Sequence, residues 1–347
     1  MKIEKKKLAD LTLCYCVAPL HVNGRSCLAV ASEKEFPCLL FDEHGNYIEQ
    51  IWAGPGGTMT ALQIAGTDGE FLATHRFYSP NNCKEASIVL CRRGEDGWSV
   101  KTLLELPGVH RFDVLRRNGT NWLIACTIKS DYEYKDDWRF PGKVWVCRLP
   151  DDLHSLPEDY RLPAVAIREG LLKNHGYSRN LKDGVETAIV TCEQGVFRFT
   201  PPEVPDGEWE VEELLCEPTS DALLVDFDRD GEEELLTLSP FHGDTLRVFK
   251  RSGGTFVKVY EYENPIPFAH AICAAGPEDA RFAVLGHRKG ERDLFALRWE
   301  DGKYHMELLD HDVGPANALS FQLDGKTVVL AANREINEID YYTLSNT

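Results

Sequence analysis

The sequence contains no apolar run long enough to cross a membrane, since a spanning helix needs about 20 consecutive apolar residues. The first eight residues, Met-Lys-Ile-Glu-Lys-Lys-Lys-Leu, lack the apolar segment of a secretory signal. A basic surplus is missing too: 38 lysines and arginines oppose 56 acidic residues, a net charge of −18. Nucleic acids and anionic membranes bind basic surfaces, so neither is expected as a partner. We expect a cytoplasmic protein.

Sequence motifs for several chemistries are also absent. The eleven cysteines form no Cys-x-x-Cys pair, and most, such as Cys14 and Cys126, fall inside predicted strands. This favours buried free thiols in a reducing compartment over disulfides or a zinc-thiolate site. No Gly-rich phosphate loop, nucleophile elbow or His-Glu-x-x-His occurs. Nucleotide chemistry and a serine hydrolase therefore have no support.

A repeated turn is what the sequence does contain. In residues 219–250 an apolar run enters the turn Asp230-Gly231 and a second apolar run leaves it, which is typical of a β-hairpin. The turn recurs at spacings of roughly 45 to 50 residues, with one longer gap. Its copies are Asn23-Gly24, Asp68-Gly69, Asn118-Gly119, Asp183-Gly184, Asp230-Gly231, a degenerate Gly276-Pro277 and Asp324-Gly325.

Seven such units predict an all-β, seven-bladed β-propeller with four antiparallel strands in each blade. The apolar runs are too short and too β-branched for a solenoid of helix pairs. One domain accounts for the whole chain. The expected blades cover residues 11–53, 56–106, 109–168, 172–216, 219–263, 265–311 and 313–347.

The last unit is too short for a fourth strand, and residues 2–10 supply a spare one. We expect these residues to form the outer strand of the last blade, because closing the ring leaves no free sheet edge. The alternative is a frayed N-terminal tail.

Histidines concentrate on one predicted face. The Asx-Gly turns join the first and second strands of each blade, so the loops at the other strand ends share the opposite face. Six of the eleven histidines fall in those loops: His75, His110, His175, His242, His270 and His287. Three of them, His110, His175 and His270, enter innermost strands and should lie closest to the axis.

Imidazoles that converge on a channel mouth can bind a divalent metal, with water or substrate completing its coordination. We expect His110, His175 and His270 as ligands, with His242 or Glu193 as a fourth. Manganese, zinc, magnesium and calcium all remain open. The alternative is that each histidine caps a strand end or bonds a loop carbonyl.

Tyrosines and basic residues surround these histidines, which suits a small carbohydrate substrate that has hydroxyls and a carboxylate. The predicted proton acceptors are His75, His287 and Tyr177, and the predicted proton donors are Tyr132 and Lys129. The predicted substrate-binding residues are Arg334, Arg179 and Trp138. Trp138 lies in an insertion, residues 129–143, that is long enough to act as a partial lid.

The turn of the fifth unit places acidic side chains at alternating positions: Asp226-x-Asp228-x-Asp230-Gly-x-x-Glu234. It resembles the FG-GAP or VCBS propeller repeat, whose consensus is Asp-x-Asp-x-Asp-Gly-x-x-Asp/Glu-Leu. That resemblance implies one structural calcium site at Asp226, Asp228, Asp230 and Glu234. The alternative is an acidic hairpin without an ion. The other six turns lack the acidic triplet.

Lone histidines at the starts of inner strands, beside degenerate Asp-Gly turns, also resemble the propeller of aldos-2-ulose dehydratase and related bacterial keto-sugar lyases. The resemblance implies elimination of water or an alcohol from a keto-sugar, with a metal in the propeller mouth. This chain lacks the cupin domains appended in that family. Two alternatives stay open: a glycoside hydrolase or isomerase that uses the same face, and a non-catalytic binding or scaffold propeller.

Overall fold

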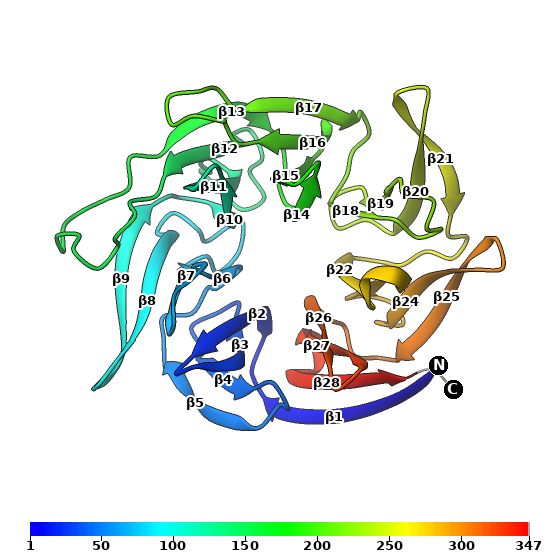
Figure 1. The fold of residues 1–347 in the computed structure, drawn as a ribbon, viewed down its shortest axis with the longest axis horizontal. Helices are drawn as coiled ribbons and strands as arrows, with labels where there is room; N and C mark the ends of the chain where they lie inside the picture. Colours follow the sequence, from blue (N-terminus) through cyan, green and yellow to red (C-terminus); the bar gives the residue numbers. More distant parts are fainter. Residues whose placement is uncertain (346–347) are drawn as a thin grey trace.

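The computed structural model describes residues 1–345. Within that range the chain forms seven antiparallel sheets of four strands, arranged as a ring around a central axis (Figure 1). The predicted seven-bladed β-propeller is therefore confirmed. The predicted last blade extends to residue 347, and residues 346 and 347 lie outside the described residues.

Each blade begins with its innermost strand. Blades 1 and 2 consist of β2 (Cys14–Val22), β3 (Arg25–Ser32), β4 (Cys38–Asp42), β5 (Tyr47–Trp52), β6 (Ala61–Gln63), β7 (Glu70–His75), β8 (Ser87–Gly94) and β9 (Gly97–Glu105). Blades 3 and 4 consist of β10 (Val109–Arg117), β11 (Thr120–Lys129), β12 (Pro141–Arg148), β13 (Val165–Leu171), β14 (Tyr177–Lys182), β15 (Val185–Cys192), β16 (Gly195–Thr200) and β17 (Glu210–Leu215).

Blades 5 and 6 consist of β18 (Asp221–Val225), β19 (Glu234–Ser239), β20 (Thr245–Ser252), β21 (Thr255–Glu261), β22 (Ala269–Ala275), β23 (Phe282–His287), β24 (Leu294–Glu300) and β25 (Lys303–Asp310). Blade 7 consists of β26 (Asn317–Leu323), β27 (Lys326–Asn333), β28 (Glu338–Ser345) and β1 (Lys2–Asp10). The helical segments are two short 3₁₀ turns, η1 (Glu278–Ala280) and η2 (Arg334–Ile336). No helix among residues 1–345 has the length and apolar character that crossing a bilayer requires.

The N-terminal strand closes the ring. β1 pairs antiparallel with β28, from Lys2 opposite Ser345 to Asp10 opposite Glu338, so the first and last strands of the chain lie side by side (Figure 1). The Lys5 ammonium lies 2.7 Å from the Asp310 carboxylate and ties β1 to the neighbouring blade 6. The predicted closure is confirmed, and residues 2–10 do not form a frayed tail.

The core is divided among the seven blade interfaces. Seven hydrophobic clusters among residues 1–345 pack between neighbouring blades, and the one between blades 2 and 3 also includes Tyr15 of blade 1 and Ala316 next to blade 7. The second strand of a blade has a neighbour on both faces, and every residue of β7 and β19 is buried. This explains why these strands contain apolar residues at successive positions, such as Phe71-Leu72-Ala73, instead of alternating apolar and polar residues. All eleven cysteines are free and nine are buried, as expected from the sequence.

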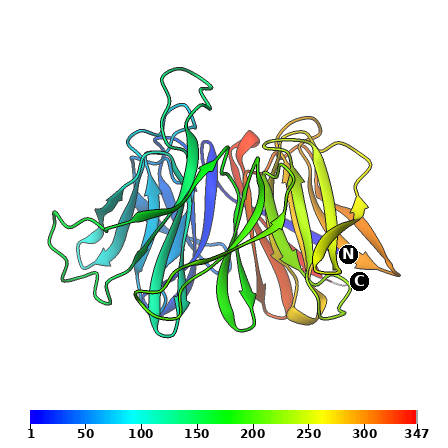
Figure 2. The ribbon, with the colours of Figure 1, turned by 90° about the horizontal axis from the view of Figure 1, so that it is seen from above.

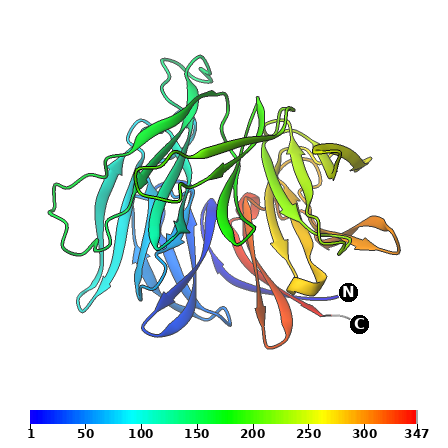
Figure 3. The same ribbon diagram turned by 45° about the horizontal axis from the view of Figure 1, so that its top comes forward.

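Tight turns set the direction of each blade. In the Asp183-Gly184 turn both residues have positive φ, 52° and 78°, the type I′ geometry that fits the twist of a two-residue hairpin. These turns lie on one face of the ring, so the remaining loops share the other face. On that other face the loop between β11 and β12 rises above its neighbours (Figures 2 and 3).

Candidate functional site

Three innermost strands contain a β-bulge where they enter the ring. The register of β2 shifts at Tyr15, that of β10 at His110 and that of β22 at His270. A bulge leaves one residue unpaired and re-aims its side chain. The three side chains meet at the axis: the Tyr15 hydroxyl lies 3.3 Å from Nε2 of His110 and 3.2 Å from Nε2 of His270.

Loops bring in two further histidines. His175 precedes β14, and its backbone N–H donates to the Thr191 carbonyl at 3.2 Å. Gly176 follows it in a place where a Cβ atom would lie 2.4 Å from the Ser220 carbonyl oxygen, so only glycine fits. His242 lies in the loop between β19 and β20 with a φ of 51°, a left-handed conformation that is uncommon for a bulky residue.

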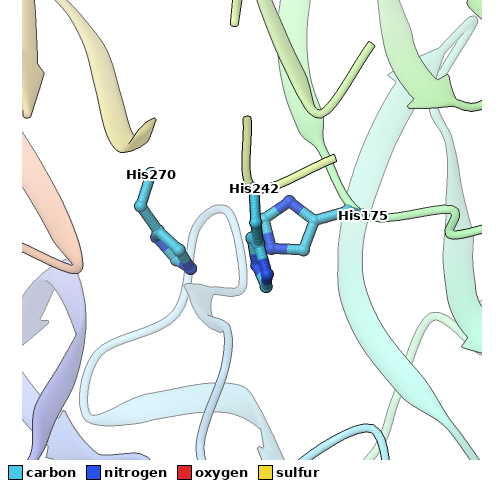
Figure 4. A group of neighbouring side chains, drawn as sticks. All are labelled: His175, His242 and His270. Atoms are coloured by element: carbon cyan, nitrogen blue, oxygen red, sulfur yellow. The ribbon is translucent and has the colours of Figure 1, made fainter. Parts of the chain in front are cut away.

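The imidazoles of His175, His242 and His270 converge (Figure 4). One ring nitrogen of each lies within 4.8 Å of one ring nitrogen of each of the others. The ring of His110 adjoins them, with its centroid 4.6 Å from that of His175. We call these four residues the histidine cluster. The structure thus brings together His110, His175 and His270, which the sequence placed near the axis, and adds His242.

Hydrogen bonds fix which nitrogen carries the proton in three of these rings. Nδ1 of His175 lies 2.9 Å from a carboxylate oxygen of Asp221. Nδ1 of His270 lies 2.6 Å from the Ala316 carbonyl oxygen, and Nδ1 of His110 lies 3.2 Å from the carbonyl oxygen of His175. Since these oxygens only accept hydrogen bonds, each Nδ1 donates and each Nε2 presents a lone pair.

Lone pairs outnumber donors inside the histidine cluster. The Nε2 atoms of His175 and His242 are buried and have no hydrogen-bond partner among residues 1–345. The lone pairs of His110 and His270 share the single hydroxyl proton of Tyr15. A buried acceptor without a partner costs about 1–3 kcal/mol. A bound cation would satisfy these nitrogens together.

Burial favours the neutral form of three imidazoles in the cluster, those of His110, His242 and His270. It holds the pKa values of His110 and His270 well below the usual range, and neighbouring positive groups act in the same direction. The pKa of His242 is lowered to about 2, mainly by burial. Burial also raises the pKa of Tyr15 to about 12, so its hydroxyl keeps its proton. At neutral pH His110, His242 and His270 are therefore neutral, and the Tyr15 phenol is protonated.

His242 is held between two aromatic rings. Its ring centroid lies 3.9 Å from that of Phe241 and 4.1 Å from that of Phe268 in stacked geometry. Phe268 also has a left-handed backbone, with φ of 60°. Arg288 and Lys289 lie over Phe268 at 4.8 and 5.0 Å. Strained backbone conformations of this kind cost about 1–3 kcal/mol each and concentrate at functional sites.

Of the two residues predicted as a fourth metal ligand, geometry favours His242. The carboxylate of Glu193 forms an ion pair with Lys173 at 2.8 Å. The ring nitrogens that approach within metal-binding distance among residues 1–345 include His242 and not Glu193. Glu193 thus neutralises Lys173, whose ammonium lies 5.5 Å from the Phe241 ring.

The two histidines predicted as bases lie in other surroundings. His75 packs against Trp52 with ring centroids 4.7 Å apart, and burial lowers its pKa to about 4. Nδ1 of His287 lies 2.7 Å from the Lys289 carbonyl oxygen, and its Nε2 accepts the Asp293 backbone N–H at 3.1 Å. His287 therefore has no free lone pair for a substrate proton, because its loop uses both nitrogens.

Two arginines predicted to bind substrate are already paired. Arg179 Nε lies 3.0 Å from the Asp113 carboxylate, and Arg334 bonds to Glu33. Tyr177, predicted as a base, donates its hydroxyl to the same Asp113 at 3.0 Å, and burial raises its pKa well above the usual range. Arg179, Arg334 and Tyr177 thus bond to carboxylates of the protein, which leaves them few hydrogen-bond donors for a substrate.

The insertion of blade 3 encloses a lysine. Lys129 is 1% exposed, and its ammonium lies 3.9 Å from the Trp138 ring and 5.5 Å from the Tyr132 ring. It donates to the Asp137 carbonyl oxygen at 2.7 Å, and burial lowers its pKa. Trp138 also contacts Phe241 with ring centroids 5.5 Å apart. Phe241 therefore separates these three residues from His242, and they form an aromatic cage beside the histidine cluster.

The ammonium group of Lys250, on strand β20, lies among the carboxylates of the acidic loop, residues 226–234. The Lys250 ammonium lies 2.5 Å from Asp228, 2.6 Å from Asp230 and 3.1 Å from Glu234. Oxygens of Asp226, Asp228 and Glu234 also lie close enough together to hold a metal ion. Calcium binding at this loop stays a prediction, and the ion would have to displace the lysine.

Sequence reasoning assigned no role to three polar residues of the site. Tyr15 occupies the same bulge position in blade 1 as His110 in blade 3, which an alignment of the strand starts would have indicated. Asp221, the first residue of β18, bonds to His175. Arg111 directly follows His110 and extends into the channel, and no local pattern distinguishes it from other strand arginines.

Comparison with known proteins agrees with the fold. No family model matches this sequence, and no curated protein sequence matches it. Virginiamycin B lyase from Staphylococcus aureus is 15% identical with a TM-score of 0.60, over 99% of this chain and 100% of that one. The Cps50 (Swd1) β-propeller domain of Myceliophteria thermophila is 10% identical with a TM-score of 0.62, over 99% and 100%.

The soluble aldose sugar dehydrogenase of Escherichia coli is 12% identical with a TM-score of 0.52, over 100% of both chains. At such identities the likeness is one of fold. The chain is thus a seven-bladed β-propeller with a buried histidine cluster at one end of its channel. Propellers support different activities, so the function must be argued from the site.

Proposed function

We propose that this protein is a metal-dependent carbohydrate lyase or dehydratase that carries out β-elimination on a keto-sugar at the histidine cluster. The observation that supports this most directly is the convergence of His175, His242 and His270, of which two present buried Nε2 atoms without a partner. Both nitrogens are buried, and neither has a hydrogen-bond partner among residues 1–345. A metal ion is small enough to occupy such a space and takes lone pairs from all of them.

The residues fit a transition metal better than magnesium or calcium. Imidazole is a common ligand for zinc, copper, iron and nickel, whereas magnesium, calcium and manganese prefer oxygen ligands. Three histidine ligands with a free coordination position are typical of catalytic zinc sites. The bonds from His175 to Asp221 and from His270 to Ala316 are the outer contacts that orient metal-binding histidines.

A divalent ion at this place would supply Lewis acidity to the carbonyl oxygen of a keto-sugar. His110 is the proton acceptor in this scheme, since the hydrogen bond from its Nδ1 to the His175 carbonyl oxygen leaves the lone pair on Nε2. Tyr15 is the proton donor, since it stays protonated and bonds to His110. Both assignments replace the donors and acceptors expected from the sequence alone.

The proposed step balances within these residues. The C–H proton beside the carbonyl goes to Nε2 of His110, and its electron pair becomes the new C=C bond. The C–O bond breaks, and the leaving oxygen takes the Tyr15 proton. The His110 proton then returns to the phenolate through their 3.3 Å hydrogen bond. General acid–base catalysis of this kind contributes about 10²- to 10⁴-fold in rate.

The surroundings support a polar, sugar-sized ligand. Arg288 and Lys289 flank the Phe268 ring on the cluster face, although the whole protein is acidic. Among similarly folded proteins, one acts on aldose sugars and another is a lyase. These likenesses are compatible with a carbohydrate enzyme, and the histidine cluster carries the argument.

Burial favours a second function. His175, His270 and His110 are only 1%, 2% and 3% exposed. A metal enclosed to this degree would also suit a structural role in a non-catalytic binding or scaffold propeller. The two functions differ in whether the metal is needed for turnover or only for stability.

Metal analysis of the purified protein tests the proposal. We expect one transition metal per chain, lost in a His175→Ala, His242→Ala double variant and kept in His44→Ala, an exposed histidine elsewhere. Incubation with 3-keto-glycosides should then produce absorbance of an enone. Metal without enone, together with a lower Tm after chelation, would favour the scaffold. Metal-free, fully folded protein would exclude the proposal.

A further inference from the structure

A small cavity in the central channel adjoins the histidine cluster. It has a volume of about 160 Å³, and its wall includes Arg111, Tyr177, Asp221, His270 and Asn317. Since His270 belongs to both, a ligand in this cavity would contact the cluster directly. Typical pockets for drug-sized ligands start at about 300 Å³, so this space suits one small ring and no oligosaccharide.

Arg111 is a channel arginine whose charge is not neutralised. Its guanidinium donates to the Met59 carbonyl oxygen at 2.8 Å and to Oδ1 of Asn317 at 3.2 Å, both uncharged acceptors. Among residues 1–345 it has no carboxylate within ion-pair distance, and it is half-buried. Arg179 and Arg334, by contrast, are each paired with acidic side chains. The guanidinium is half-buried and also lies 5.7 Å from the centroid of the Tyr15 ring, so its charge faces no carboxylate and its remaining N–H groups are available to a ligand.

The carboxylates of the channel are already bonded to other groups. Asp221 accepts hydrogen bonds from His175 at 2.9 Å and from the Ser220 hydroxyl at 3.1 Å. Asp113 accepts bonds from Tyr177 and Arg179 at 3.0 Å each. The guanidinium of Arg111 has five N–H groups in a planar fork, and two acceptors leave others free. That fork matches a carboxylate with two parallel hydrogen bonds.

We propose that Arg111 binds the carboxylate of a monomeric sugar acid in this cavity, so that the substrate is a uronate-type keto-sugar. The inference rests on the proposed function for its chemistry, because it places the sugar ring between Arg111 and the histidine cluster. The carboxylate would anchor the ring, and the carbonyl would face His270. Arg111 is thus a substrate-binding residue that replaces Arg334 and Arg179 in that role.

Equilibrium binding of D-glucuronate, D-glucose and D-glucose 6-phosphate to the intact protein tests this inference. We expect glucuronate to bind at least tenfold more tightly than either of the others. Arg111→Gln should weaken glucuronate binding by about 10- to 100-fold, the loss expected for hydrogen bonds between charged groups, and leave glucose unchanged. Arg116→Gln, an exposed arginine on the same strand β10, is the matched control and should have no effect.

Equal binding of the three sugars, an unchanged glucuronate affinity in Arg111→Gln, or tighter binding of the phosphate would each overturn the inference. Should Arg111→Gln fail to fold, Arg111→Lys gives the same test, because lysine keeps the charge and loses the fork. The metal content and enone production of the wild type are measured separately. If neutral keto-sugars give an enone and Arg111→Gln has no effect on glucuronate binding, the inference is rejected and the proposed function stands. If glucuronate binds but the protein holds no metal and forms no enone, the proposed function is rejected and the inference about binding stands.

Discussion

Nδ1 of His175 lies 2.9 Å from the carboxylate of Asp221, although the two residues belong to neighbouring blades and are 46 positions apart. The side chain of Asp221 is 5% exposed and that of His175 is 1% exposed, so water does not compete for the bond. The carboxylate fixes the proton on Nδ1, and Nε2 therefore presents its lone pair to His242 and His270. The bond orients one ring of the candidate metal site from outside it.

Replacing Asp221 by Asn should lower metal affinity by about 10- to 100-fold, as is usual when a histidine ligand loses its outer partner. The amide can present its N–H₂ to Nδ1, which favours the wrong tautomer of His175. Chelator competition measures the effect. Asp42→Asn, in an outer turn of blade 1, is the control. Equal affinities in both variants would contradict the role given to Asp221.

Tyr15→Phe should lower kcat for elimination by about 10²- to 10⁴-fold without changing the metal content. The variant removes the hydroxyl that lies between His110 and His270 and keeps the ring that packs beside them. Single-turnover rates on a 3-keto-glycoside measure the loss. Activity within threefold of the wild type would show that another group donates the proton.

Acid should destabilise the metal-free protein through the buried imidazoles. The pKa values of His110 and His270 are well below the usual 6.5 in the folded state, and that of His242 is about 2. Below pH 6.5 the unfolded chain binds protons that the folded chain does not, so stability falls as the pH falls. Each of these histidines contributes up to about 1.4 kcal/mol per pH unit.

Urea unfolding at pH 7.0 and pH 5.5 measures this dependence. His242→Phe keeps the stack with Phe241 and Phe268 and removes one titrating group, so its loss of stability over this range should be smaller by up to about 1.4 kcal/mol. The exposed His305→Phe should leave the dependence as it is. The same pH dependence in all three proteins would disprove the assigned cause.

Deleting residues 1–10 should expose the edge of β28 and lower Tm. The pairing with β1 and the contact of Lys5 with Asp310 and Asp340 would be lost. Unpaired strand edges associate with other chains, so we also expect concentration-dependent oligomers. Thermal unfolding and analytical ultracentrifugation are the measurements. A Lys2→Ala, Glu4→Ala variant, which changes only exposed side chains of β1, should keep the oligomeric state and the Tm of the wild type.

Lys250→Ala should make the acidic loop responsive to calcium. The ammonium of Lys250 contacts three carboxylates of that loop, so its removal leaves Asp228, Asp230 and Glu234 to repel one another. Calcium should raise the Tm of the variant by several degrees more than that of the wild type. Scanning calorimetry with calcium and with magnesium measures these shifts. Equal Tm shifts in the variant and the wild type would show that calcium does not bind to the acidic loop.

The repeat could be predicted from the sequence because it depends on local features, namely turn residues and short apolar runs. Turns such as Asp183-Gly184 need positive φ, and the strands that follow them contain apolar residues at successive positions, since each second strand is covered on both faces. Spacing then gave the blade number, and the short last unit gave the closure by residues 2–10. The nearness of His110, His175 and His270 followed from strand order alone.

Hydrogen bonds and ion pairs between side chains of different blades could not be predicted from the sequence. Arg179, Arg334 and His287 are polar residues near the site in sequence, and only tertiary contacts show that Asp113, Glu33 and backbone groups already occupy them. The roles of Tyr15 and Arg111 follow from contacts that only the fold creates: Tyr15 lies between His110 and His270, and Arg111 lines the channel cavity. Lys250 similarly meets the acidic loop across a neighbouring strand.

The chain by itself determined the ring, its seven units and the end of the channel where imidazoles gather, because backbone dihedral preference and apolar periodicity act over a few residues. The folded arrangement decided which lone pairs stay without a partner and which charges stay without a counter-ion. Those properties depend on distances between side chains from different blades. These distances decide whether a polar group already has a hydrogen-bond or ion-pair partner or is available to a ligand.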